Sequence, residues 1–463
     1  MEGIHNTQQV YFVGIGGIGM SAIARYFMHE GLPVAGYDRT STPLTKALEN
    51  EGAAIHYEDD IEQIPELFKN RENTLVIYTP AIANDHSELS MFRREGFRCI
   101  KRSQCLGVLA ANKYVMAVSG THGKTSTSTL TAWLNSKVSN SGCAFLGGIS
   151  KNFGSNLVLG EGRRLAVEAD EFDRSFLQLY PDAAVITSAD ADHLDIYGTH
   201  EAVKEAFSQF VAQIKAGGAL CIKEGVDISL PNTDITIYRY SIDKGDFHAE
   251  NITQLEGGYY QFDIVTPDKV FKQCRLGIPC RINIENAIAA VALLWIASKA
   301  EQMPIDEELL RTALAEFSGV KRRFEFYINT PKQVYMDDYA HHPRELSATL
   351  SSIKQMFENR DIVAIFQPHL YTRTRDLYAE FAEALSIADE VILLPIYPAR
   401  EEPIEGITSE IIADRLSVPY RIVEREALCD TLEQMTTDVV ISFGAGNIDA
   451  YCEAIAETLK KRS

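Results

Sequence analysis

The chain has 463 residues, 46% of them hydrophobic and 23% charged. This length and composition predict a soluble protein of two or three domains. Its formal net charge of −20 repels phosphate backbones, so we expect no nucleic-acid partner. No apolar run approaches the roughly 18 residues that cross a bilayer, and we therefore expect no membrane partner.

Two further features indicate the cytoplasm. Residues 1–9 have neither the basic nor the apolar segment of a secretion signal. The eight cysteines are scattered without a CxxC pair, which fits reduced thiols better than disulfides or a zinc site. A protein this acidic must hold an anionic substrate locally, with backbone N–H groups, a few basic side chains and a divalent cation.

The N-terminal segment has the pattern of a β–turn–α–β unit. An apolar strand at residues 10–15 ends in a glycine-rich turn, and a helix at 20–29 and a strand at 33–37 follow. The turn fits G-x-G-x-x-G, with an acidic residue about 20 positions later, and indicates a phosphorylated ligand, either a dinucleotide or a UDP-sugar. The candidate ligand-binding residues are Gly14, Gly16, Gly17, Ile18, Gly19 and Asp38. A strand at 74–79 and a connector at 103–112 complete this part.

A second unit begins with a strand at residues 114–119, a glycine turn and a helix at 125–136. Such a turn between strand and helix directs backbone N–H groups at phosphate oxygens. Lys124 can reach the β- and γ-phosphates, and the Thr125 hydroxyl can bind Mg²⁺. The turn is shorter than the full G-x-x-x-x-G-K-[ST] pattern, and the alternative is a tight turn with a solvated lysine. The candidate phosphate-binding residues are Gly120, Thr121, His122, Gly123, Lys124, Thr125 and Ser126.

Acidic segments follow the next two predicted strands, at residues 164–167 and 183–187. The first segment begins at Glu168, which is our first choice as a ligand for a hard cation. The second contains His193. Because ligands gather at the carboxyl ends of parallel strands, we expect His193 to face the same metal ion.

The remaining sequence predicts a small antiparallel excursion within residues 233–274, a helix at 284–299 and a third α/β unit. The strands of the third unit are predicted at 333–336, 361–366, 390–394 and 439–442. We therefore predict an α/β protein of three domains. They are a Rossmann-like N-terminal domain at 1–107, a central P-loop ATPase-type parallel sheet at 108–322, and a Rossmann-like C-terminal domain at 323–463.

Polar residues again follow two strands of the third unit. Residues 337–343 combine two carboxylates with two imidazoles, and residues 366–375 contain two arginines. Arginine at a strand end suits bidentate capture of a carboxylate. A zinc site formed by His341, His342 and His369 is a weaker alternative, because adjacent histidines on an extended loop point apart.

In combination these motifs resemble the Mur ligase family across essentially the whole chain. The matching segments, in family order, are residues 12–21, 120–125, 168–171, 192–195, 319–324, 337–343 and 366–369. His122 stands where other members usually carry Asn, which points to the branch that adds the first amino acid. The resemblance implies ATP-dependent ligation of L-alanine to the carboxylate of UDP-N-acetylmuramate through an acyl phosphate, in peptidoglycan precursor synthesis.

The resemblance also implies residue roles. Lys124, Glu168, His193 and Arg323 would be catalytic, and Thr125, Glu168 and His193 would hold Mg²⁺. The glycine turn and Asp38 would bind the UDP-sugar. Further contacts would come from Asn283 and Asn286 to adenine, from Arg323 and Asp338 to ATP, and from Tyr339, His341 and Arg373 to the amino acid. The partners would be ATP, UDP-N-acetylmuramate and L-alanine, with the protein a monomer or weak homodimer.

The chain departs from the family pattern at four positions. Ile282 replaces a usual His, Leu370 a frequent Arg and Tyr37 a common Ser, and Phe207 occupies the region of a modified lysine. Two other functions stay open. A recycling relative attaches a whole tripeptide to the same UDP-sugar, and an NAD-dependent oxidoreductase would use the first glycine turn but leave the phosphate loop without a role.

Overall fold

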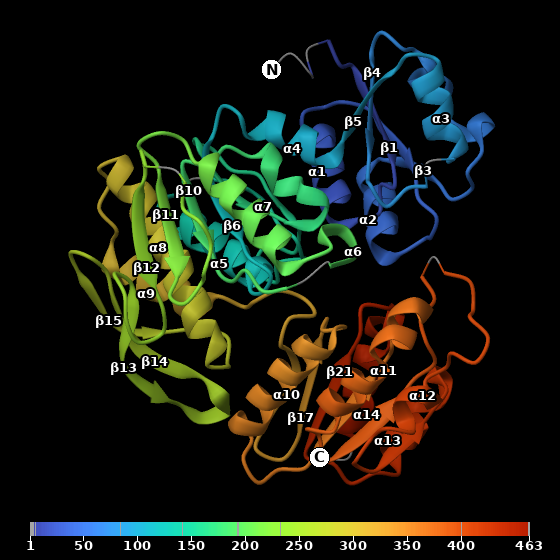
Figure 1. The fold of residues 1–463 in the computed structure, drawn as a ribbon, viewed down its shortest axis with the longest axis vertical. Helices are drawn as coiled ribbons and strands as arrows, with labels where there is room; N and C mark the ends of the chain where they lie inside the picture. Colours follow the sequence, from blue (N-terminus) through green and yellow to red (C-terminus); the bar gives the residue numbers. More distant parts are fainter. Residues whose placement is uncertain are drawn as a thin grey trace. The chain divides into compact units, whose positions relative to one another are not determined.

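The computed structural model describes residues 4, 6–83, 85–140, 142–191, 194–231, 233–399 and 401–461. Within these residues the chain is an α/β protein with four sheets, three of them largely parallel (Figure 1). The predicted α/β fold is confirmed. Contacts divide the chain into two compact units, residues 1–252, 261–277 and 283–318 in one and residues 253–260, 278–282 and 319–463 in the other.

The N-terminal sheet has five parallel strands in the order β3-β2-β1-β4-β5. They are β1 Gln9–Val13, β2 Val34–Tyr37, β3 Ala54–His56, β4 Thr74–Tyr78 and β5 Arg98–Lys101. The helices are α1 Ile18–His29, α2 Pro43–Glu51, α3 Ser87–Arg94 and α4 Arg102–Ala110, with 3₁₀ turns η1 Ile61–Gln63 and η2 Glu66–Lys69. The central strand β1 is buried along its whole length, as expected where both faces of a parallel sheet are covered. The predicted connector at 103–112 is instead the helix α4, which buries Cys105, Leu106 and Ala110.

The central sheet has the order β12-β11-β10-β6-β9-β7-β8 and is parallel except for β8, which pairs antiparallel with β7. Its strands are β6 Tyr114–Ser119, β7 Cys143–Phe145, β8 Leu157–Val158, β9 Arg164–Glu168, β10 Ala183–Ile186, β11 Ala219–Lys223 and β12 Thr236–Tyr240. The helices are α5 Lys124–Val138, η3 Phe172–Gln178, α6 Leu194–Tyr197, α7 His200–Ala212, α8 Ile282–Ala300 and α9 Glu307–Glu316. The three strands predicted for this region, now β6, β9 and β10, are confirmed, and each is almost entirely buried.

The antiparallel excursion is confirmed as a separate three-stranded sheet of β13 His248–Gln254, β14 Tyr260–Val265 and β15 Val270–Arg275, with η4 Glu256–Gly258 between the first two. It begins later than predicted. The β12 strand, which the sequence placed in the excursion, pairs parallel with β11 and extends the central sheet.

Helix α8 has no uninterrupted apolar run of 18 residues, because Asn283, Glu285 and Asn286 lie near its start. By length and average composition it is still the one helix among the described residues that could cross a membrane, yet 78% of its most apolar window is buried inside the protein. A helix that is apolar on all sides fits the core of a large protein as well as a bilayer. Its burial identifies α8 as a core helix.

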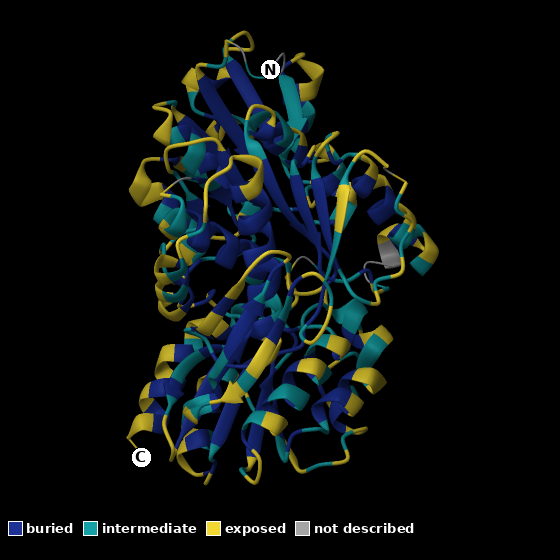
Figure 2. Ribbon diagram, turned by 90° about the vertical axis from the view of Figure 1, so that its left-hand side faces the viewer, coloured by how far each residue is buried: buried dark blue, intermediate teal, exposed yellow. Residues whose placement is uncertain are grey.

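The C-terminal sheet has the order β16-β17-β21-β18-β19-β20, with only β16 antiparallel to its neighbour. Its strands are β16 Glu325–Asn329, β17 Val334–Asp338, β18 Ile362–Phe366, β19 Glu390–Leu393, β20 Tyr420–Ile422 and β21 Val439–Phe443. The helices are α10 Pro343–Met356, α11 Tyr371–Leu385, α12 Glu410–Ala413, η5 Arg425–Ala427, α13 Leu428–Glu433, η6 Asn447–Tyr451 and α14 Cys452–Lys460. The strands are mostly buried and the helices expose one side (Figure 2). All four strands predicted here are present.

A carboxyl group lies in the core of the N-terminal sheet. Glu88 is 0% exposed, accepts a hydrogen bond of 2.6 Å from the Tyr11 hydroxyl, and has its Oε1 3.4 Å from Nε2 of His56. Burial, helped by the nearby charge of Asp59, raises the pKa of Glu88 from 4.5 to about 7. The folded protein therefore binds more protons than the unfolded chain between these two values, so its free energy of unfolding falls as pH rises through that window.

We expect Glu88→Gln to remove this loss, which amounts to at most about 3 kcal/mol. The amide keeps an acceptor for Tyr11 but carries no charge. Denaturant unfolding at pH 5 and pH 8 should show a smaller drop in stability for this variant than for the parent. The control is Glu95→Gln, at the exposed end of α3, which should behave as the parent does. An equal pH dependence in all three proteins would contradict the assignment.

Candidate active site

The loop between β6 and α5 has the geometry of a phosphate-binding turn. Gly120 and Gly123 adopt φ values of +133° and +80°, which side chains disfavour. A Cβ at Gly120 would lie 2.1 Å from Oγ1 of Thr187. Helix α5 begins at Lys124, and its N-cap Gly123 provides no side-chain hydrogen bond. The first-turn N–H groups and the helix dipole are therefore available to an anion.

Two side chains after β10 hold this loop in place. The Ser188 hydroxyl lies 2.8 Å from Oγ1 of Thr121 and accepts a 2.9 Å hydrogen bond from the backbone N–H of His122. The Thr187 hydroxyl donates to the carbonyl of His122. Neither residue was among the predicted site residues, although their place at the end of a neighbouring parallel strand is a signal that could have indicated them.

Lys124 is paired with Glu171, a residue that was not among the predicted site residues. The Lys124 Nζ lies 2.8 Å from each carboxylate oxygen, and the Glu171 side chain is 1% exposed. Burial disfavours the ammonium, but the attraction of Glu171, Asp170 and Glu168 outweighs it and raises the pKa of Lys124. The Lys124 ammonium is therefore charged at neutral pH and held at the end of β6 before any nucleotide arrives.

Glu168 lies at the end of β9 beside the start of α5. Its Oε1 accepts a 3.2 Å hydrogen bond from the Thr125 hydroxyl, and its Oε2 accepts one of 3.4 Å from Ser128. A Cβ at Gly147 would lie only 2.3 Å from this carboxylate. Any larger residue at position 147 would therefore displace the Glu168 side chain. A hydroxyl beside one carboxylate is the oxygen donor set that Mg²⁺ uses when substrate phosphates complete its coordination.

The third predicted metal ligand, His193, lies outside the described residues. Among the residues that are described, no three His, Cys, Asp or Glu side chains form a metal-binding group. This finding also leaves the zinc alternative at His341, His342 and His369 without support, since all three are described. Thr125 and Glu168 fit a cation that is bound mainly together with ATP.

The predicted adenine pair lies at the start of α8. Asn286 Nδ2 donates to Oδ1 of Asn283 at 3.0 Å, and its own Oδ1 accepts a 3.2 Å hydrogen bond from Thr127 of α5. A Cβ at Gly123 would lie 3.0 Å from that same oxygen. Asn286 thus adjoins the phosphate loop, and Asn283 is bonded to it.

The N-terminal glycine turn is closed by an acidic side chain. The backbone N–H of Gly16 donates to Oδ2 of Asp38 at 2.7 Å, and Gly14 has φ +89°. Gly17 is the N-cap of α1 and Ile18 its first residue. A Cβ at Gly19 would lie 2.8 Å from Nη1 of Arg102, so a guanidinium lies beside this helix terminus. No sequence motif indicated Arg102, whose positive charge is suited to a phosphate group.

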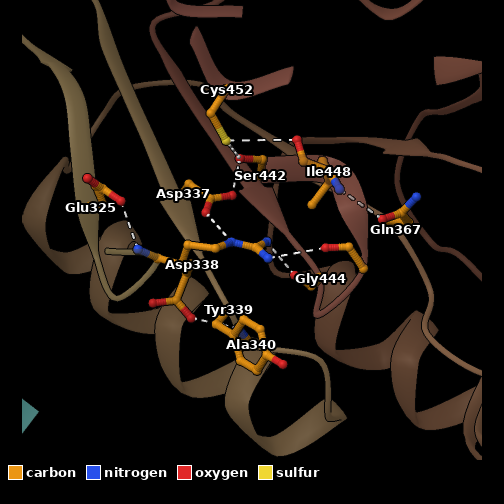
Figure 3. A network of polar contacts seen from close by, with 12 residues as sticks. Glu325, Asp337, Asp338, Tyr339, Ala340, Gln367, Ser442, Gly444, Ile448 and Cys452 are labelled. Atoms are coloured by element: carbon orange, nitrogen blue, oxygen red, sulfur yellow. Dashed lines mark hydrogen bonds and ion pairs between the residues drawn. The ribbon is translucent and has the colours of Figure 1, made fainter. Parts of the chain in front are cut away.

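The predicted residues of the C-terminal domain form their own group around β17. The Asp338 carboxylate accepts 2.9 Å hydrogen bonds from the backbone N–H groups of Phe324 and Ala340, while its neighbour Asp337 lies in a separate network (Figure 3). Burial, opposed by Arg323, raises the pKa of Asp338 to about 6. The Arg323 guanidinium lies 5.4 Å from the ring centre of Tyr339, a cation–π contact.

His341 lies next to this group. Its ring centre is 5.3 Å from that of Tyr339 and 6.2 Å from that of His369. Burial lowers the pKa of His341, and Arg373 adds to the effect, so the imidazole is neutral at pH 7. Arg373 is in the first turn of α11, after Leu370 with φ +71°. The structure thus brings the three predicted amino-acid-binding residues to one end of the C-terminal sheet.

The chain belongs to the Mur ligase family of ATP-dependent ligases. Three family models match successive segments. The family's catalytic domain matches residues 9–114, its middle domain residues 118–294, and its glutamate ligase domain residues 322–446. The domain boundaries that we predicted stay a prediction.

Individual relatives are similar over the whole length. The UDP-N-acetylmuramate–L-alanine ligase of Phocaeicola vulgatus is 47% identical, with 99% of this chain and 100% of that protein covered. A crystal structure of a UDP-N-acetylmuramate–alanine ligase from Thermotoga maritima superposes with a TM-score of 0.81 at 28% identity, over 98% of this chain and 100% of that one. A murein peptide ligase from Psychrobacter arcticus shares the fold, with a TM-score of 0.70 at 21% identity and 98% of both chains covered.

Proposed function

We propose that the protein joins L-alanine to the carboxylate of UDP-N-acetylmuramate at the expense of ATP, the first amino-acid addition in peptidoglycan precursor synthesis. The observation that carries the proposal is the convergence of Lys124, Thr125 and Glu168 at the ends of β6 and β9. It occurs in a chain that is 47% identical, end to end, to a relative named for this reaction.

The chemistry has two steps, and the chain's own residues position and neutralise charge in each. In the first, a sugar carboxylate oxygen bonds to the γ-phosphorus and the bond to ADP breaks. In the second, the alanine amine, having lost a proton, bonds to the carbonyl carbon and phosphate leaves. Lys124 stabilises charge on the transferring phosphoryl group, and the N–H groups of the phosphate loop bind the other phosphates.

A magnesium ion bound with ATP would supply further charge neutralisation. The Thr125 hydroxyl and the Glu168 carboxylate would hold it, with His193 as the third proposed ligand. The glycine turn with Asp38 binds the UDP-sugar, and Asn283 and Asn286 bind adenine. In the C-terminal domain, Arg323 and Asp338 contact ATP.

The amino acid is bound in the C-terminal domain by Tyr339, His341 and Arg373. Arg373 is suited to the alanine carboxylate, because a guanidinium binds carboxylates bidentately. We place the reaction in the cytoplasm, which the eight free cysteines support, and expect a monomer or weak homodimer.

A substrate panel tests this proposal. The purified protein, UDP-N-acetylmuramate, ATP and Mg²⁺ should release ADP when L-alanine is added, and far less with L-alanyl-γ-D-glutamyl-diaminopimelate. With ¹⁸O in the sugar carboxylate, one labelled oxygen should appear in the released phosphate at each turnover. ADP release only with the tripeptide would favour the recycling ligase, and tight NADH binding without ATP turnover would favour an oxidoreductase.

A further inference from the structure

Two doublets in the sequence, Arg322-Arg323 and Asp337-Asp338, have members with different polar partners, although both guanidinium groups lie over the ring of Tyr339. The second member of each doublet belongs to the proposed ATP contacts. The first members instead form a buried ion pair, in which Nε of Arg322 donates to Oδ2 of Asp337 at 2.9 Å. Asp337 is 0% exposed, and no step of the proposed reaction uses it.

The Arg322 guanidinium also joins a loop that follows β21. Its Nη2 donates to the carbonyl of Gly444 at 2.5 Å and its Nη1 to that of Gly446 at 3.2 Å. Gln367 holds the start of η6, directly after this loop, because its Oε1 accepts a 3.1 Å hydrogen bond from the N–H of Ile448 (Figure 3). The planar fork of an arginine thus connects one carboxylate with two carbonyls, which a lysine cannot reproduce.

Asp337 is held from its other side. Its Oδ1 accepts a 2.7 Å hydrogen bond from the Ser442 hydroxyl, which lies 3.0 Å from the hydroxyl of Tyr335. The carboxylate therefore has a partner on each oxygen, as a buried charge requires. The pair is thus held by β17, by β21 and by the loop that follows β21.

The backbone next to this pair carries the proposed ATP contacts. Arg322 has φ +61° and Phe324 φ +44°, conformations that non-glycine residues adopt only when their surroundings impose them. The carbonyl of Arg322 accepts a 2.7 Å hydrogen bond from the N–H of Tyr339, and the N–H of Phe324 donates to Asp338. The turn at residues 322–324 and the end of β17 are thus joined by hydrogen bonds in both directions, next to the Arg322–Asp337 pair.

We propose that Arg322 and Asp337 are a positioning pair, which fixes the strained turn at residues 322–324 against β17 and so orients Arg323 and Asp338 for the nucleotide. This inference rests on the proposed function, since it assigns the orientation of that site. The pair itself does not touch ATP, and it acts through its neighbours in both segments.

The test is the double variant Arg322→Met/Asp337→Leu, which replaces the ion pair with apolar side chains and leaves no buried charge unpaired. Such replacements often keep or raise stability. We expect a midpoint of thermal unfolding close to that of the parent, unchanged UDP-sugar affinity, and a kcat lowered by about 100-fold, on the order of a misplaced catalytic group. The matched control is Arg421→Met/Glu390→Leu, which removes the 2.8 Å pair between β20 and β19 and should leave kcat unchanged.

Arg322→Lys is the second variant, and it tests the positioning role of the pair if the double variant does not fold. It keeps the charge but loses the fork, and should lower kcat by about 10-fold with no change in UDP-sugar affinity. A kcat within twofold of the parent in a folded variant would overturn the proposal. So would a fall in kcat that matched the loss of folded protein, because that is the signature of a structural role alone.

Amide hydrogen exchange separates this inference from the proposed function, because it needs no substrate. In the free double variant, the amides of Phe324 and Ala340 should exchange at least tenfold faster, while those of β18 stay protected. Unchanged exchange at both amides would overturn the inference even if the protein is a ligase. Faster exchange would support it even if the substrate panel failed.

Discussion

Lys124→Ala should lower kcat by on the order of 10³-fold or more while UDP-N-acetylmuramate still binds with nearly its original affinity. The loss is large because Lys124 is the basic side chain that the phosphate loop contributes to the transferring phosphoryl group, and removing one such charge commonly costs this much. The proposed UDP-sugar site is formed by other residues, around Gly16 and Asp38. The affinity for the UDP-sugar should therefore not fall with kcat.

The measurement combines ADP release with calorimetric titration of the UDP-sugar. Lys124→Ala also leaves Glu171 buried without its cation, which can cost about 3–5 kcal/mol of stability. Lys124→Met/Glu171→Gln avoids this loss and should be equally inactive. Lys137→Ala, in the last turn of α5, is the control and should keep full activity. An equal loss of turnover and of sugar binding would contradict the division of the sites.

Glu168→Gln should have the second largest effect, a fall in kcat/KM for ATP of roughly 10²–10³-fold, the cost of losing one strong charge-stabilising contact. The amide keeps its size and can still accept the hydrogen bond from Thr125, but it removes the negative charge that a cation requires. The apparent Mg²⁺ requirement should rise in parallel.

A titration of activity against Mg²⁺ at saturating ATP measures this second effect. Asp170→Asn is the matched control in the same acidic segment, and it should shift the Mg²⁺ requirement much less, because Asp170 caps the N–H of Phe172. If both variants required the same Mg²⁺ concentration as the parent, Glu168 would not be a ligand.

The phosphate loop could be predicted because its signal is local. The glycines, the lysine and the flanking apolar strand lie within residues 114–126, and backbone geometry alone makes that combination informative. Most of the buried strands were predicted for the same reason, since they are short apolar runs, although β11, which is also such a run, was missed. By contrast, β3 and β20 contain no buried residue, and their sequences give no such run.

The pairing of Lys124 with Glu171 could not be predicted from the sequence. Three acidic residues, Asp170, Glu171 and Asp173, follow β9, and only the turn of the chain after Glu168 decides which of them meets the lysine. That turn includes Asp173 and Arg174 at positive φ, a conformation that nothing in their residue types requires. The role of Arg102 beside Gly19 has the same origin, because it depends on how α4 packs near α1.

The C-terminal doublets are an intermediate case. The family motif identified Asp338 and Arg323 as candidate site residues. The residue types alone do not distinguish them from their neighbours Asp337 and Arg322. Strand alternation separates Asp337 from Asp338, since successive side chains of β17 point to opposite faces. The partner of Asp337 could not be predicted from the sequence, because Arg322 reaches it only through a left-handed turn.

The central claim is that Lys124 and a cation held by Glu168 meet on the same triphosphate. Diffraction from crystals grown with a non-hydrolysable ATP analogue and Mn²⁺, recorded at the manganese absorption edge, tests it most directly. We predict an anomalous peak between the Glu168 carboxylate, the Thr125 hydroxyl and the terminal phosphates, with Lys124 Nζ within hydrogen-bonding distance of the γ-phosphate. A nucleotide bound away from this loop, or manganese bound without Glu168, would contradict it.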